Sequence, residues 1–162
     1  MVATLYRRIL GGKGEAMNWM LLPYKRYFDF NGRSRRQEYW MFTLLGVLVT
    51  LACSIFMVAG GLSLASGDVE PEFGATFFLG AVVLGLFVLA SVLPGIAVTV
   101  RRLHDRDMSG WWYLAAIVIG TVPYIGFLAS IALFVVMVLP GTPGPNRFGP
   151  DPLDPTNATV FA

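Results

Sequence analysis

The chain has 162 residues, of which 56% are hydrophobic and 14% charged, and its formal net charge is +2. An average soluble domain carries about a quarter charged residues, so this composition excludes a soluble enzyme, a disordered chain and a secreted disulfide scaffold. The near balance of 12 basic against 10 acidic residues gives no reason to expect nucleic acid as a partner.

The charges are unevenly placed along the chain. Three stretches, residues 39–67, 73–100 and 108–146, contain no Asp, Glu, Lys or Arg. A membrane-spanning helix needs roughly 20 predominantly apolar residues, and each stretch is longer than that. The sequence therefore predicts an all-α, polytopic membrane helical bundle with three long apolar segments, in a single membrane domain over residues 17–152.

Two segments precede the first span. Residues 1–16 are expected to form a flexible leader, because glycines interrupt them and no apolar run of a signal peptide follows their basic residues. Residues 17–30 are dense in aromatic and basic side chains, which predicts an N-terminal interfacial segment in the headgroup layer.

The first span is expected over about residues 40–62, preceded by an Asn-Gly turn and a helix start. Ser34 and Gln37 have the spacing of a capping box, in which the Ser34 hydroxyl accepts a hydrogen bond from the Gln37 N–H. A helix that begins at Arg35 would then continue into the span. Residues 63–75 follow as a short acidic loop without Lys or Arg.

The second and third apolar segments are expected over about residues 76–100 and 111–139, with a kink at Pro94 in the second. The third is too long for a simple span, because its 29 residues would reach about 43 Å as a helix. Glycine and proline at residues 120–126 leave two interpretations open. The segment is either one tilted, kinked helix or a hairpin of two shorter helices, which raises the number of helices to four.

The distribution of basic residues predicts the orientation. Eight Lys or Arg residues precede the first span, none lies in the 63–75 loop, and three lie in residues 101–110. The positive-inside rule therefore places the N-terminus and the 101–110 loop in the cytoplasm. The side of the C-terminal tail, with residues 153–162 expected to be disordered, depends on whether residues 111–139 cross once or form a hairpin.

Charged residues outside the spans are the candidate binding residues. Guanidinium groups are bidentate partners for lipid phosphate, although anchoring at an anionic leaflet explains the same basic residues. A carboxylate such as Asp105 is a further candidate partner for Arg35 or Arg36. The residues expected to bind lipid phosphate or a partner are Arg33, Arg35, Arg36, Glu38, Arg101, Arg102, His104, Asp105, Arg106 and Arg147.

Residues 101–112 hold the only histidine, His104, next to Asp105. An enzyme site would use His104 as a general base, but adjacent side chains point apart, so Asp105 is badly placed to orient it. One histidine among arginines is also a poor metal site. Helix capping is the favoured interpretation, in which the two leading arginines complement the end of the second span and Asp107 or Ser109 caps the next helix.

Three motifs occur in order around the apolar segments: YFDFNGRSRRQEYW (residues 27–40), RRLHDRDMSGWW (101–112) and PGTPGPNRFGPDP (140–152). Together they resemble the bacterial membrane family known as domain of unknown function 805, the YhaH-like inner-membrane proteins, and the resemblance covers residues 17–152. It implies a bacterial inner-membrane location, with no established activity, cofactor or catalytic residue.

The favoured function is that of a non-enzymatic membrane protein whose arginine-rich cytoplasmic face binds membrane lipids, another copy of itself or another membrane protein, without a cofactor or metal. Alternatives are an enzyme that acts on lipid headgroups through His104 and Asp105, and a subunit of an oligomeric channel that uses glycine-rich helix faces. If residues 111–139 form a hairpin, the charged segments 33–38, 101–107 and 146–151 share the cytoplasmic side, where one Arg/Asp network is expected.

Overall fold

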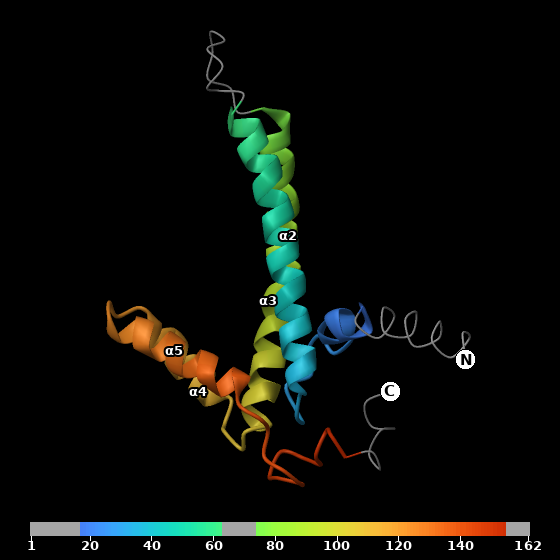
Figure 1. Cartoon of the computed structure of the whole chain (residues 1–162), viewed down its shortest axis with the longest axis vertical. Coiled ribbons are helices and arrows are strands. Elements are labelled where there is room, and N and C mark those ends of the chain that lie inside the picture. The colour runs from blue at the N-terminus through green and yellow to red at the C-terminus, as the bar shows by residue number, and fades with distance from the viewer. Residues whose placement is uncertain (1–16, 63–73, 155–162) are drawn as a thin grey trace, which may run out of the picture. The chain divides into compact units, whose positions relative to one another are not determined.

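The computed structural model describes residues 17–62 and 74–154 of the chain (Figure 1). The predicted leader, most of the predicted acidic loop and the tail from residue 155 lie outside these residues. The described residues are helical apart from turns, irregular chain and one isolated bridge between Asn146 and Gly149. This architecture confirms the predicted all-α membrane fold.

The described residues belong to two compact units. Unit 1 contains residues 17–42 and 93–154, and unit 2 contains residues 43–62 and 74–92. The two long helices have one part in each unit, so each unit is described by itself.

Helix α2 (Arg36–Leu62) has 27 residues and begins within one residue of the predicted start. The predicted capping box is wrong in its partner, because the Ser34 hydroxyl donates to Glu38 Oε2 at 2.6 Å instead of accepting from the Gln37 N–H. A hydrogen bond from a hydroxyl to a carboxylate is stronger than one between two neutral groups. The Ser34 hydroxyl is therefore oriented toward Glu38.

Helix α3 (Ala75–His104) has 30 residues and extends four residues beyond the predicted span, so that the basic residues of its last turn are still helical. Pro94 lies inside it and is buried. At 1.5 Å per residue, α2 and α3 are about 40 and 45 Å long, enough to cross a hydrocarbon core of about 30 Å. These two helices are long and apolar enough to span a membrane.

Small residues allow the two long helices to approach closely in unit 2. A Cβ added at Gly80 would lie 2.9 Å from the Cys53 carbonyl oxygen, and one added at Gly60 would clash with the Phe77 backbone. By contrast, Gly46 and Gly85 have no heavy atom of another segment within 4 Å of such a Cβ. The close contact therefore depends on two particular glycines.

The third apolar segment forms a hairpin of two helices, which settles the alternative that the sequence left open. Helix α4 (Trp111–Gly120) has 10 residues and helix α5 (Ile125–Val138) has 14. The break follows from Pro123, which has no N–H to donate, and from Tyr124, whose φ of 64° is not helical. The residue before α4 is Gly110, which makes no side-chain cap, so Asp107 does not cap this helix. The predicted alternative, Ser109, accepts a hydrogen bond from the Trp111 N–H at 3.5 Å.

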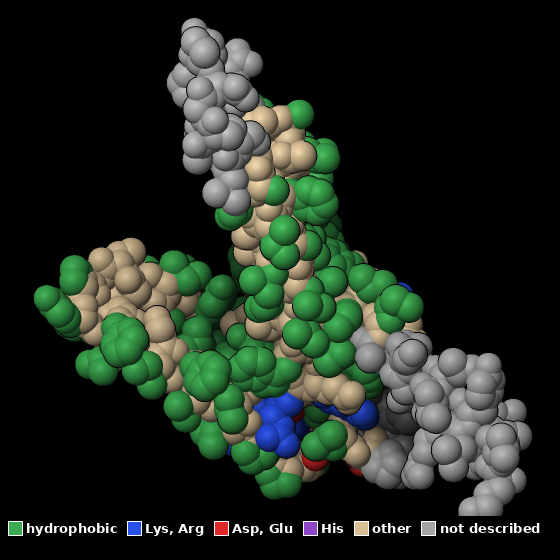
Figure 2. Space-filling view, turned by 45° about the horizontal axis from the view of Figure 1, so that its top comes forward, with side chains coloured by type: hydrophobic (Ala, Val, Ile, Leu, Met, Phe, Trp, Pro, Cys, Tyr) green, Lys and Arg blue, Asp and Glu red, His purple; other side chains and the backbone are tan. Residues whose placement is uncertain are grey.

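Unit 1 places the ends of these elements together. Residues 17–25 are helical, and Tyr24 packs edge-on against Phe42 with ring centroids 5.4 Å apart. The most deeply buried apolar side chains of the unit include Val98, Leu103 and Met137, from the end of α3 and the end of α5. On the face shown in Figure 2, hydrophobic side chains are widely spread, whereas lysines and arginines gather in one small area.

Candidate functional site

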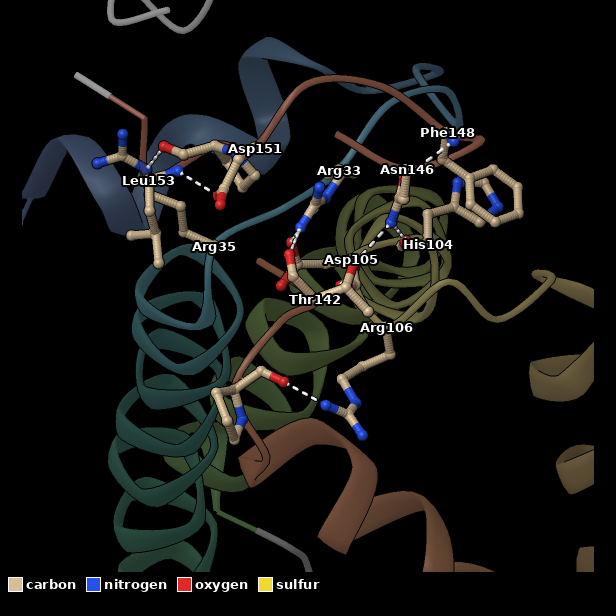
Figure 3. A network of polar contacts seen from close by, with 12 residues as sticks. Arg33, Arg35, His104, Asp105, Arg106, Thr142, Asn146, Phe148, Asp151 and Leu153 are labelled. Carbon is tan, nitrogen blue, oxygen red and sulfur yellow. Dashed lines mark hydrogen bonds and ion pairs between the residues drawn. The ribbon is translucent and has the colours of Figure 1, made fainter. Parts of the chain in front are cut away.

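Charged side chains from three separate parts of the sequence meet in unit 1 (Figure 3). They come from the chain around the start of α2, from the end of α3, and from residues 139–152 after the hairpin. The expected Arg/Asp network of the hairpin interpretation is therefore present. Its buried members, called here the arginine network, are Arg33, Glu38, Arg101, Arg102 and Asp105.

The first half of the arginine network joins α2 to α3. Arg101 Nη2 donates to Glu38 Oε1 at 2.8 Å, and the two side chains are 0% and 3% exposed. The second guanidinium nitrogen of Arg101 donates to the carbonyl oxygen of Asp29, and the Ser34 N–H donates to the Arg101 carbonyl at 3.1 Å. Arg101 Nε is buried without a hydrogen-bond partner, so Glu38 is the group that compensates this charge.

The second half is centred on Asp105. Its Oδ1 accepts from Arg33 Nε at 2.9 Å, and its Oδ2 accepts from Arg102 Nη1. Burial raises the pKa of the Asp105 carboxyl, and the guanidiniums of Arg102 and Arg33 offset only part of that rise. Taking the carboxylate out of water is thus the costly part of this arrangement.

The same arginines satisfy backbone carbonyls of the chain that follows the hairpin. Arg33 donates to the carbonyl oxygens of Thr142 and Gly144, each at 2.6 Å. Arg102 donates to Met137 and Leu139. Two arginines outside the buried set continue the series, since Arg36 donates to Val138 at 3.2 Å and Arg106 donates to Pro140.

This pattern has a physical reason in the sequence. The last carbonyls of a helix have no intrahelical donor, and the five prolines of residues 140–152 supply no N–H groups that could take part in a regular structure. A guanidinium presents several donors in a planar fork, which a lysine ammonium does not. Arginines therefore suit a row of unpaired carbonyls that lies close to a carboxylate.

One prediction about these residues is wrong. Arg33 pairs with Asp105, not Arg35 or Arg36, because these two follow it into the start of α2 and direct their side chains to Pro152 and Val138 instead. Arg101 and Arg102 lie in the last turn of α3, as predicted, and Arg102 also donates to carbonyls at the C-terminal end of α5. The error concerns which of several neighbouring arginines reaches a distant segment.

His104 does not form an acid–base pair with Asp105. Its Nδ1 lies 3.1 Å from the Gly32 carbonyl oxygen, and its ring stacks on Phe148 with centroids 3.9 Å apart. Because a carbonyl only accepts, Nδ1 must carry the proton in this contact. The amide of Asn146 donates to the His104 carbonyl at 2.9 Å, so His104 holds the C-terminal segment in place.

The outer part of the site is solvent-accessible. Arg147 pairs with Asp107 at 3.1 Å, with side chains 60% and 47% exposed. Arg26 pairs with Asp29 at 2.7 Å. Partial burial raises the pKa of Asp29, but the hydrogen bonds from Arg26 and from the Asn31 N–H outweigh it and leave that pKa below its ordinary value.

A pocket of about 370 Å³ lies beside the arginine network in unit 1. The start of α2 contributes Arg35, Arg36 and Gln37, and the opposite wall is residues 140–143 and 151–153. Arg35 also lies 5.7 Å from the ring centroid of Trp19. This cavity, called the Arg35–Arg36 pocket, is a concave surface lined by two of the candidate arginines.

The two carboxylates at the pocket are already engaged. Asp105 is held by Arg33 and Arg102, and Asp151 accepts from the N–H groups of Gly144 and Leu153 at 3.0 and 2.8 Å. In the described part of the chain, no group of three or more His, Cys, Asp or Glu side chains is placed to hold a metal ion. Arg35 and Arg36 are therefore the candidate ligand-binding residues at the pocket.

The sequence gives little warning of two residues that complete the site. Thr142 and Asn146 have polar contacts that depend on the return of the chain after the hairpin. The signal that could have found them is the alternation of proline with small polar residues in the 140–152 motif, which leaves carbonyls exposed for donors.

Comparison with known proteins identifies relatives over most of the chain. A family described as protein of unknown function (DUF805) matches residues 27–150. The inner membrane proteins YhaH and YhaI of Escherichia coli K12 are each 38% identical over 136 residues, covering 84% of this chain and 97% and 96% of theirs. The uncharacterized protein YiiR of the same strain is 30% identical over 146 residues, covering 78% and 88%. No solved structure matches the chain.

Proposed function

The chain belongs to the DUF805 family of proteins of unknown function, and from this premise we propose that it is a multi-pass inner-membrane protein that binds an anionic phospholipid headgroup at its cytoplasmic surface. The observation that carries the proposal is the Arg35–Arg36 pocket, a cavity lined by two arginines beside the arginine network. No step of catalysis is part of the proposal.

The orientation rests on the charge distribution. Eleven of the twelve basic residues lie in residues 7–36 and 101–106, and the 63–75 loop has only acidic charges. The positive-inside rule favours the cytoplasm for both basic clusters. The pocket, which lies among these clusters, would then face the leaflet surface where anionic headgroups attract basic side chains.

Burial limits which arginines can act on a ligand. Arg33, Arg101 and Arg102 are at most 2% exposed and are held by carboxylates and carbonyls, so a headgroup phosphate has no access to them. Arg36 is exposed, and Arg35 is half-buried on the pocket wall. The proposal therefore assigns phosphate recognition to Arg35 and Arg36, and a supporting role to the buried arginines.

The volume of the pocket and the electrostatic potential at its wall also suit such a ligand. Its volume of about 370 Å³ lies within the usual range for small-molecule sites, about 300–1,000 Å³. Because α2 begins at Arg36, the N-terminal end of the helix dipole adds a positive potential at the same wall. Two guanidiniums and the helix end together favour a phosphodiester over a neutral or zwitterionic headgroup.

The test is the binding of short-chain phosphatidylglycerol to the purified protein in a nonionic detergent, followed by thermophoresis, with short-chain phosphatidylcholine and inorganic phosphate as competitors. Hydrogen bonds to charged groups contribute about 1.5–3 kcal/mol, so the Arg35→Gln/Arg36→Gln variant is expected to lose roughly tenfold or more in affinity. Arg36→Gln alone, at an exposed position, is expected to show part of this loss.

Matched controls are Arg147→Gln and Lys25→Gln, which remove exposed basic residues outside the pocket. They are expected to bind phosphatidylglycerol within about twofold of the unchanged protein, since rim charges act weakly. Equal binding by the double variant and the unchanged protein would contradict the proposal. Competition by inorganic phosphate alone would show that the pocket recognises the phosphate and not the lipid.

A further inference from the structure

The α4–α5 hairpin is too short to cross a membrane. Its helices have 10 and 14 residues, which correspond to about 15 and 21 Å at 1.5 Å per residue. A hydrocarbon core is about 30 Å thick. Neither helix can therefore extend from one surface of the core to the other.

Both ends of the hairpin are held at the arginine network. On the entry side, the Met108 N–H donates to the Leu103 carbonyl at 3.0 Å, and α4 begins three residues later. On the exit side, Arg102 donates to the carbonyls of Met137 and Leu139. The chain thus leaves the network and returns to it, and the tip lies no farther from it than one helix length.

The tip of the hairpin satisfies most of its own backbone N–H groups. Those of residues 121, 122, 125 and 126 donate to carbonyls at distances of 2.7–3.2 Å, Pro123 has no N–H, and the Tyr124 N–H has no backbone partner among the described residues. The Thr121 hydroxyl donates to the Val118 carbonyl at 2.8 Å. Gly126 lets the helices meet, because a Cβ there would lie 2.5 Å from the Gly120 carbonyl oxygen. Most donors of the turn are therefore paired without water, as backbone in a hydrocarbon environment requires.

The outside of the hairpin is apolar on all sides. Val118, Phe127 and Leu128 are at least 62% exposed, and residues 108–146 contain no Asp, Glu, Lys or Arg. In Figure 2 the hairpin, at the left, shows no charged side chain on the face in view. Trp111 and Trp112, both exposed, stand at its base, where interfacial tryptophans are expected.

We propose that the α4–α5 hairpin is inserted into the single leaflet that adjoins the arginine network, and that it turns within the hydrocarbon core without crossing it. The acyl chains of that leaflet cover the surface of the hairpin, which is too apolar to face water. Residues 140–154 then lie on the same side of the membrane as residues 17–35. This proposal is independent of headgroup binding in the Arg35–Arg36 pocket.

The test uses site-directed spin labels in proteoliposomes. The chain has one cysteine, Cys53, so Cys53→Ala gives a background for single cysteines at Trp111, Phe127 and Tyr124, which are 75%, 70% and 89% exposed. Collision rates with oxygen, which concentrates in the hydrocarbon, and with a water-soluble nickel chelate report the depth of each label. The oxygen-to-nickel ratio is expected to be lowest at Trp111 and highest at Tyr124.

Each other arrangement has its own outcome. A hairpin that crosses would give nickel access at Tyr124, and one that lies flat in the interface would give the same ratio at all three positions. A hairpin covered by a second copy would give low collision rates with both reagents. Any of these results would overturn the proposal. The label at Phe127 is a second deep position, and its agreement with Tyr124 shows that the result does not come from a local distortion at the tip.

Discussion

The most direct test of the arginine network is to remove the charge of Glu38. Its carboxylate accepts from Arg101 at 2.8 Å and from Ser34 at 2.6 Å, and Glu38 and Arg101 are both buried. Glu38→Gln keeps the shape of the side chain but leaves the Arg101 charge without its carboxylate. Removing one partner of a buried ion pair costs about 3–5 kcal/mol, because the other charge is then uncompensated.

For a chain of this length, 1 kcal/mol corresponds to about 2–4 °C in Tm, so Glu38→Gln is expected to lower Tm by roughly 6–20 °C. The assay is the loss of the monodisperse peak in size-exclusion chromatography after heating the purified protein in detergent. The matched control is Asp107→Asn, which breaks the exposed pair with Arg147. Exposed pairs contribute about 0–1 kcal/mol, so a Tm for Glu38→Gln equal to that of Asp107→Asn would refute the reasoning.

Two further predictions concern the hairpin and the N-terminal segment. Gly126→Ala is expected to destabilise the protein by about 1–3 kcal/mol through overpacking. Its control is Gly120→Ala, where the new Cβ has no atom of another segment within 4 Å, and Tm is expected to stay unchanged or rise slightly. Equal Tm shifts for the two variants in the same assay would argue against the close contact. Because the folded pKa of Asp29 lies below its ordinary value, its pairing with Arg26 stabilises the fold at neutral pH and is lost as the pH falls through that pKa, below about pH 4. The Tm difference between the unchanged protein and Asp29→Asn should therefore disappear in acid, and a difference that grows there would contradict this sign.

The spans could be predicted from the sequence because they depend on local composition. The predicted ends of residues 40–62 and 76–100 lie within about one helical turn of α2 and α3. The choice between one helix and a hairpin over residues 111–139 could not be made, because a kinked helix and a broken one have the same composition. Pro123 marks the break, but only the positive φ at Tyr124 shows that the chain reverses there.

The residues that belong to the arginine network could be predicted better than the pairs that they form. Charged residues excluded from the spans are expected to gather, and Arg33, Arg101 and Asp105 lie in one buried network. Which arginine reaches Asp105 depends on where the chain enters α2. Arg33 precedes the helix and extends to Asp105, whereas Arg36 is its first residue and faces the end of α5. Local sequence patterns contain no information about that geometry.

The buried charges are better explained by positioning than by stability. Burying ions costs several kcal/mol each before pairing, so a network of this kind is weak evidence for a stable fold. The network joins segments whose association in lipid has no hydrophobic driving force, because lipid tails are as apolar as the helices. Arg33 and Arg102 fix residues 137–144 beside the start of α2.

Residues 140–143 of this segment form part of the second wall of the Arg35–Arg36 pocket. The pocket exists only while the chain after the hairpin is held against α2, so the buried arginines are a condition for the proposed role of Arg35 and Arg36. A guanidinium can do this because it reaches a carboxylate and two carbonyls at once, as Arg33 does with Asp105, Thr142 and Gly144. The abundance of arginine over lysine near the spans therefore suits two roles, a fixed C-terminal segment and the proposed site for an anion beside it.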